Sequence, residues 1–173
     1  MAGRRPEGMS AWRQARAIAL LPGVVTVAVP AILVAGTGTS VGWGLGGVAA
    51  ALPVLLGAVL IAAGFALWLW TVRLLAQIGK GTLAPWDPTS RLVVAGPYRL
   101  VRNPMITAVI TVLAGEAALF GSLPLLLWAT GFFALNHVGF LVYEEPGLER
   151  RFGDEYRAYK REVPRWLPRR GGG

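Results

Sequence analysis

The sequence predicts an all-α protein, a polytopic membrane bundle of about four transmembrane helices with a helical hairpin and a cytoplasmic C-terminal amphipathic helix. Hydrophobic residues make up 54% of the 173 residues and charged residues only 15%, which is too apolar for an ordinary soluble domain. No Asp, Glu, Lys or Arg occurs from Ala17 to Val72, and Pro104–Tyr143 holds only Glu116 and His137 as ionisable groups before its closing Tyr143. Apolar tracts of this length are typical of membrane spans.

The apolar tracts divide into spans at glycines and prolines. The uncharged, glycine-rich "TGTSVGWGLGG" predicts a short turn after the first span, and "GSLP" predicts a break between the third and fourth. Prolines inside the first span are tolerated because neighbouring helices can satisfy the freed backbone groups. The expected spans are Ala17–Gly36, Val48–Val72, Met105–Phe120 and Leu125–Tyr143.

The basic residues lie on one side of these spans. All 17 Lys and Arg fall before Ala17, within 73–102 or after Tyr143, and none falls in the two opposite loops. The positive-inside rule therefore predicts an integral protein, expected in a prokaryotic inner membrane, whose two termini and active site face the cytoplasm. The same rule accounts for the net charge of +8, so no nucleic-acid partner is expected. The basic N-terminus is interpreted as the flank of a retained span.

One membrane domain, 1–173, is expected, with two spans in 1–79 and a binding segment, the hairpin and a tail helix in 80–173. Apolar residues of the tail recur at helical spacing, and prolines end the pattern. This helix could lie on the lipid headgroups or close as a lid on the cytoplasmic span ends. The residues of its apolar face are Leu148, Phe152, Tyr156, Tyr159 and Val163.

Few polar groups in the chain can carry chemistry. There is no cysteine, and a single histidine with few inward carboxylates excludes a metal centre from our prediction. Glu144 and Glu145 follow the fourth span and either end the helix in water or bind a cation or ribose. His137 lies two turns before Glu144, either as a helix–helix hydrogen-bond partner or as the lining of a cavity. Glu116, near the opposite membrane face, is interpreted as structural.

"GPYRLVRNPM", residues 96–105, is a rigid polar segment at the start of the third span. Pro97 and Pro104 fix two φ angles, and Asn103 is excluded from the helical region by the proline after it. We therefore expect ordered, non-helical backbone, with Asn103 as a cap and Pro104 in the first helical turn. Irregular backbone at this depth is tolerated where it lines a protein-walled cavity.

"LVVAGPYRLVRNPM" and "EEPGLERRFGDEYRAYKREVPRWLP" together resemble the isoprenylcysteine carboxyl methyltransferase family and the related phospholipid methyltransferases. The resemblance covers residues 73–168 and implies an integral membrane enzyme that uses S-adenosylmethionine. By position it implies that the cofactor is bound by these residues: Ser90, Arg91, Leu92, Val93, Tyr98, Asn103, Pro104, Met105, Ile106, Glu144 and Glu145.

Two positions depart from the family pattern. The usual histidine is Asn103 here, and an amide does not titrate near neutral pH. An arginine that contacts substrate in the eukaryotic enzymes falls near Phe140, so the sequence does not support isoprenylcysteine as substrate. The catalytic candidates are His137, as a base, and Asn103.

The resulting prediction is methyl transfer from S-adenosylmethionine to a lipophilic or small acceptor: a carboxylate, amine or thiol. The alternative is a non-catalytic membrane protein that keeps the scaffold as a binding or assembly subunit. The expected partners are the lipid bilayer and a lipophilic acceptor, and small residues in the spans permit a homodimer.

Overall fold

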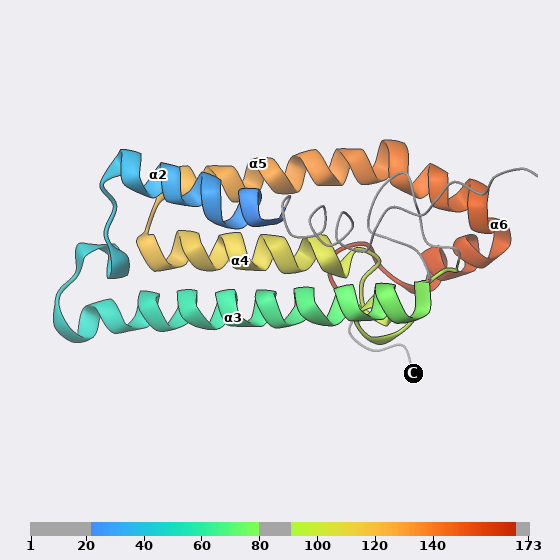
Figure 1. Ribbon diagram of the computed structural model, residues 1–173, viewed down its shortest axis with the longest axis horizontal. Helices are drawn as coiled ribbons and strands as arrows, with labels where there is room; N and C mark the ends of the chain where they lie inside the picture. Colours follow the sequence, from blue (N-terminus) through green and yellow to red (C-terminus); the bar gives the residue numbers. More distant parts are fainter. Residues whose placement is uncertain (1–21, 80–90, 169–173) are drawn as a thin grey trace, which may run out of the picture.

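The computed structural model describes residues 22–79 and 91–168, and this part of the chain contains helices and no strand. Figure 1 shows the long helices side by side along one axis, with α6 at the end opposite the loop that joins α2 to α3. The elements are η1 (Val24–Ala28), α2 (Val29–Thr37), η2 (Val41–Gly44), η3 (Gly47–Ala50), α3 (Ala51–Leu74), η4 (Leu75–Gly79), η5 (Gly96–Arg99), α4 (Pro104–Phe120), α5 (Leu123–Gly139), η6 (Phe140–Glu144) and α6 (Glu145–Glu162).

Three continuous helical stretches are long and apolar enough to cross a membrane, and α4 is a shorter apolar helix beside them. The predicted all-α membrane bundle is confirmed. The hairpin also forms where "GSLP" predicted it: α4 ends at Phe120, and Ser122 caps α5 by accepting a hydrogen bond from the Leu125 N–H at 3.5 Å. The first five residues of the predicted first span, 17–21, lie outside the described residues.

The closest packing in the bundle joins α3 and α4 through glycine. A Cβ built on Gly115 would lie 2.8 Å from the Gly57 carbonyl oxygen, and one built on Gly64 would lie 2.7 Å from the Ala108 carbonyl oxygen. These two helices share the most extensive contact of any pair. Small residues let membrane helices approach this closely, and van der Waals contact then holds them.

Two π-helical turns precede prolines. η1 ends at Ala28 before Pro30, and η6 ends at Glu144 before Pro146. A proline ring inside a helix clashes with the carbonyl four residues earlier and offers no N–H, and a wider turn relieves that clash. In η1 the Val29 N–H donates to the Val24 carbonyl, five residues earlier. The same spacing pairs the Val25 carbonyl with Pro30, which has no N–H to donate. The Trp128 indole N–H takes that place at 3.0 Å.

Replacing Trp128 with phenylalanine should therefore destabilise the protein by about 1 kcal/mol, because the Val25 carbonyl loses its donor inside the membrane. The aromatic body of the side chain is retained, so the loss reports the hydrogen bond. Thermal unfolding in detergent would measure it. Trp68→Phe is the matched control, because the indole N–H of Trp68 has no hydrogen bond in the described residues, and an equal loss in both variants would contradict this account.

The turn between α2 and α3 is held to the end of α4. Trp43 has a left-handed backbone (φ 63°), and its indole donates to the Ala118 carbonyl at 2.6 Å. The last carbonyls of a helix have no partner within the helix, so this contact satisfies one of them. Gly121 makes the approach possible, because a Cβ there would lie 2.5 Å from the Trp43 ring.

The tail helix differs from the prediction in one respect. α6 is broken at Gly153 (φ 51°, ψ −124°), where the chain turns back instead of continuing straight. The predicted apolar face is nevertheless confirmed, since Tyr156, Tyr159 and Val163 are buried together and Leu148 and Phe152 pack against them. Glycine permits the break, because other residues rarely adopt this backbone conformation.

Candidate active site

Residues 91–103 form a folded segment between α3 and α4. Gly96 (φ 53°) lies against the end of α3, where a Cβ would meet the Leu74 side chain at 2.9 Å and the Trp70 ring at 3.1 Å. The expectation of wholly non-helical backbone was wrong for Gly96–Arg99, which forms one turn of 3₁₀-helix (η5). Proline at the second position of this turn favours the helical φ, which the prediction left out of account.

Asn103 caps α4, as the sequence predicted. Its backbone is non-helical (φ −126°, ψ 62°), and its side-chain oxygen accepts from the Ile106 N–H at 3.4 Å. Its backbone carbonyl accepts from both the N–H and the hydroxyl of Thr107, at 3.1 and 2.9 Å. Asn103 is buried, and the oxygen of its amide is used within the first turn of α4.

The tail covers this segment. The Tyr159 hydroxyl donates to the Tyr98 carbonyl at 2.7 Å, and the Arg102 N–H donates to the Pro164 carbonyl at 2.9 Å. Leu92 packs against the buried tyrosines of α6. The tail helix and the chain after it therefore pack on the segment that precedes α4.

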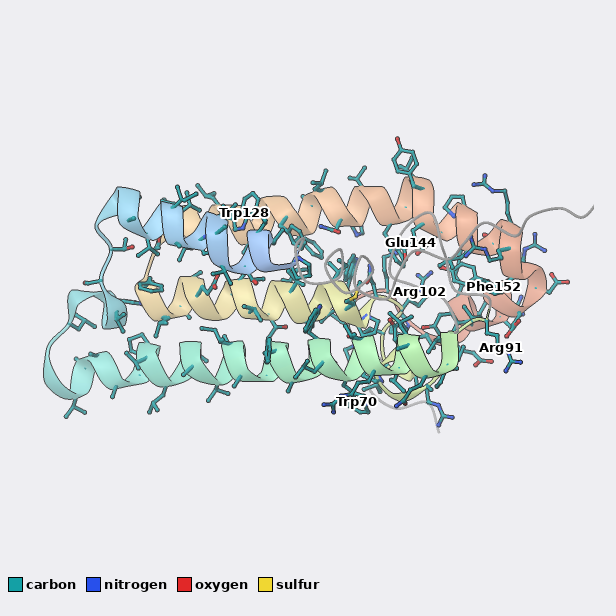
Figure 2. The ribbon with its side chains drawn as sticks, in the orientation of Figure 1. Trp70, Arg91, Arg102, Trp128, Glu144 and Phe152 are labelled. Atoms are coloured by element: carbon teal, nitrogen blue, oxygen red, sulfur yellow. The ribbon has the colours of Figure 1, made fainter. Side chains whose placement is uncertain are left out.

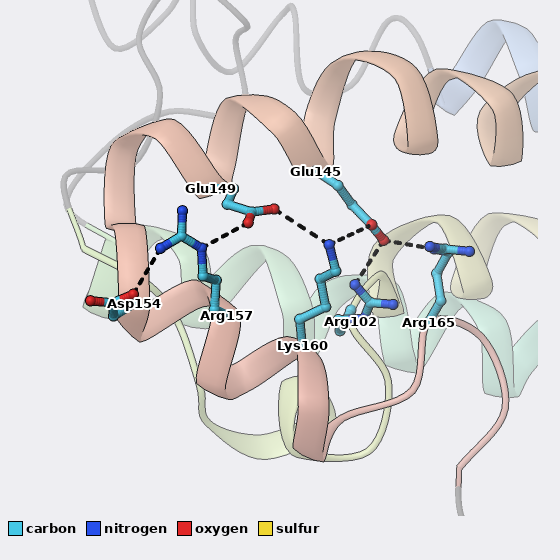
Figure 3. Close-up of polar contacts among 7 residues, drawn as sticks. All are labelled: Arg102, Glu145, Glu149, Asp154, Arg157, Lys160 and Arg165. Carbon is cyan, nitrogen blue, oxygen red and sulfur yellow. Dashed lines mark hydrogen bonds and ion pairs between the residues drawn. The ribbon is translucent and has the colours of Figure 1, made fainter.

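Glu145 is bound by three cations, as Figure 3 shows. Its carboxylate accepts from Arg102 Nη1 and Arg165 Nε, both at 2.7 Å, and Lys160 Nζ lies 3.9 Å away. Its side chain is only 6% exposed. Glu145 therefore joins the start of α6 to the segment before α4 and to the chain after α6, a structural role that its sequence position did not indicate.

Glu144, the preceding residue, is placed differently. Its side chain is exposed, and its carboxylate has no hydrogen bond or ion pair within residues 22–79 and 91–168. Figure 2 shows Glu144 at the same end of the bundle as Arg102. Burial, then the nearby Tyr159 and Glu144, raise the pKa of the Tyr98 phenol, so this hydroxyl remains a hydrogen-bond donor at neutral pH.

His137 is held by aromatic residues. Its Nδ1 accepts a hydrogen bond from the Trp166 indole at 2.8 Å, and its ring stacks on Phe133 with centroids 5.7 Å apart. A tryptophan N–H only donates, so Nδ1 must be unprotonated and the proton of the neutral ring lies on Nε2.

The other predicted cofactor residues lie along the same part of the chain. Arg91 is exposed, Val93 and Pro104 are buried, and Met105 and Ile106 are half-buried in the first turn of α4. Ser90 lies outside the described residues. Sequence reasoning missed the partners that close this end, because nothing in their spacing showed what they would contact: Tyr159, Lys160, Pro164, Arg165 and Trp166.

The chain matches one known protein family over most of its helical bundle. The family model described as phospholipid methyltransferase matches residues 52–155, more than half of the chain. This chain belongs to the phospholipid methyltransferase family. The match includes nearly all of α3, the capped start of α4, the hairpin and both glutamates, and it ends before Tyr159, Arg165 and Trp166 of the tail. A search of curated proteins and one of solved structures gave no match.

The usual methyl donor of such methyltransferases, S-adenosylmethionine, fits the polar groups at this end of the bundle. The donor carries ammonium and ribose hydroxyl groups, which a carboxylate can accept from. Glu144 is a carboxylate without a protein partner in the described residues, close to Tyr98.

Within 22–79 and 91–168 no three His, Asp or Glu side chains gather where they could bind a metal ion. Of the two adjacent glutamates, Glu145 is paired with cations, and Glu144 has no ion pair in the described residues. What the arrangement can do is hold a polar cofactor at the membrane surface beside an apolar bundle.

Proposed function

We propose that this chain transfers a methyl group from S-adenosylmethionine to a lipophilic acceptor that reaches the site from the bilayer. The observation that carries the proposal is the unpaired Glu144 carboxylate beside Tyr98, within the region that matches the family. Glu144 and Tyr98 would bind the cofactor, the 103–106 turn would form the wall beside it, and the site would face the cytoplasm of a prokaryotic inner membrane.

The residues of the chain would act mainly by positioning the cofactor and the acceptor. The bound cofactor supplies a methyl group on a sulfonium, which needs little covalent help from the protein. α6 would cover the bound cofactor and exclude water from it. The ion pairs of Glu145 with Arg102 and Arg165 support this role, because they tie the start of α6 to the segment before α4. Glu144 would orient polar groups of the cofactor through charge-assisted hydrogen bonds.

The contact between Trp166 and His137 narrows the acceptor class. Because Nδ1 of His137 accepts from the indole, the imidazole would have to release Trp166 before Nδ1 could act as a general base. Asn103 does not titrate. We therefore favour acceptors that present a lone pair without a strong base, a carboxylate or a neutral amine. The product of an amine releases its proton to water or to Glu144.

Replacing Glu144 with alanine should weaken S-adenosylmethionine binding by about 10- to 100-fold, the value of one or two charge-assisted hydrogen bonds. Isothermal calorimetry on the purified protein in detergent would measure the dissociation constant. Glu155→Ala is the matched control, because it removes one exposed negative charge from α6 away from the site. We expect Glu155→Ala to bind as the parent does.

Turnover separates catalysis from the non-catalytic alternative. Protein in vesicles of bacterial lipid extract would be given methyl-labelled S-adenosylmethionine, and label in the extracted lipid would be counted. Labelled lipid that disappears in Glu144→Ala supports the proposal. Tight binding without labelled product would favour a binding or assembly subunit. A parent protein that does not bind the cofactor would overturn the enzyme and leave the non-catalytic alternative.

A further inference from the structure

A second polar feature lies far from the site described above. An open pocket of about 460 Å³ lies between α2 and α4, and its walls include Thr26, Pro30, Val34, Glu116 and Phe120. This volume is within the range of small-molecule sites. By helical rise Glu116 lies roughly 18 Å along α4 from Pro104, so the pocket belongs to the opposite half of the bundle.

The pocket holds one polar group without a protein partner. Oε2 of Glu116 is buried and has no hydrogen bond within the described residues. Thr26, the other polar side chain of the wall, donates its hydroxyl to the Pro22 carbonyl at 2.8 Å. The remaining wall is apolar, so the described residues offer this carboxyl group no donor. A carboxyl group in such surroundings is costly and is usually kept for a ligand or a proton.

The arrangement of α2 leaves the pocket open to lipid. α2 contacts α5, and η1, which precedes it, contacts α4 and bonds through its Val25 carbonyl to Trp128 of α5. α2 itself makes at most slight contact with α4. Val27, on the pocket wall, is 64% exposed on the outer surface of the bundle. A molecule with an apolar body can therefore enter sideways from the bilayer.

We propose that this pocket binds an amine-headed lipid of the opposite leaflet, with the ammonium group donating to Glu116. An ammonium group supplies both a hydrogen-bond donor and the positive counter-charge that a buried carboxylate needs, whereas a hydroxyl group supplies only the donor. Acyl chains fill the apolar wall beside Pro30, Val34 and Phe120. This site is separate from the methyl-transfer site and does not depend on it.

Native mass spectrometry in detergent would test the proposal with dioleoyl phosphatidylethanolamine and dioleoyl phosphatidylcholine as probes. The trimethylated headgroup of phosphatidylcholine has no N–H to donate. We expect the parent to retain one more phosphatidylethanolamine than Glu116→Gln or Glu116→Leu, with affinity for that lipid about tenfold or more higher. Equal retention of the two lipids by the parent, or no change in the Glu116 variants, would overturn it.

A second variant guards against misfolding. Ala31→Phe fills the pocket from α2 at an exposed position and leaves Glu116 intact, so it should also lose one phosphatidylethanolamine. Calorimetric binding of S-adenosylmethionine should be unchanged in all three variants and shows that the other end is folded. If Ala31→Phe keeps the lipid, the pocket is not its site and the proposal fails.

Discussion

Replacing Glu145 with alanine should destabilise the protein by about 3–5 kcal/mol, the usual cost of removing one partner from a buried ionic cluster. The loss arises because Arg102 and Arg165, each 2.7 Å from the same carboxylate oxygen, would be left close together without a counter-charge. Arg102 is 8% exposed in its side chain, so water cannot replace the carboxylate there. The tail should loosen, since its other anchors to this segment are two hydrogen bonds and the packing of Leu92 against the buried tyrosines.

Thermal unfolding in detergent would measure the loss, and tryptic cleavage within the second half of α6 would report detachment of the tail. Glu149→Ala is the control, because Glu149 pairs with Arg157 and Lys160 on the exposed side of α6, where such pairs contribute little. Equal stability of the two variants would show that the cluster does not hold the tail. Cofactor affinity should fall in Glu145→Ala as well, because the segment before α4 would lose its tie to the start of α6.

A triple substitution would test whether the tail is held by the charges of this cluster or only by the contact that these side chains fill. Buried ionic clusters can often be replaced by apolar residues of similar volume without loss of stability. We therefore expect Arg102→Met, Glu145→Leu and Arg165→Met together to restore much of what Glu145→Ala alone loses. The comparison shows whether the tail needs these charges or only a filled contact.

The membrane bundle and its caps could be predicted because they depend on local composition and short-range chemistry. The uncharged tract Ala17–Val72 indicates spans without any knowledge of partners. Asn103 before Pro104 predicts a cap, because the proline excludes the helical backbone at the preceding residue. The buried face of α6 follows from residue spacing and survives the break at Gly153.

The different roles of the two adjacent glutamates could not be predicted, because they depend on the path of the chain. The π turn Phe140–Glu144 shifts the rotational register before Pro146, so a spacing of seven residues no longer places His137 and Glu144 reliably on one face. The carboxylate of Glu145 meets arginines from two distant segments, while that of Glu144 meets none. Partners of this kind leave no periodicity in the sequence.

The stability of the bundle depends on a backbone contact as much as on the polar end. Replacing Gly115 with valine should destabilise the protein by about 3 kcal/mol or more, because overpacking of a tight contact forces backbone shifts. A Cβ at Gly115 would lie 2.8 Å from the Gly57 carbonyl oxygen and 2.9 Å from the Ile61 backbone nitrogen, neither of which can move without moving α3. Thermal unfolding in detergent, with cofactor affinity alongside, would measure the effect.

Gly131→Val is the matched control, since Gly131 lies within α5 and a Cβ there meets nothing within 4 Å. Both variants exchange glycine for the same β-branched residue inside an apolar helix, so their difference reports the α3–α4 contact alone. We expect Gly131→Val to keep the stability of the parent and Gly115→Val to lose cofactor binding as well, because the start of α4 carries the Asn103 cap and the turn beside the site. If Gly115→Val is as stable as Gly131→Val, the helices can separate without cost, and the close α3–α4 contact does not position the site.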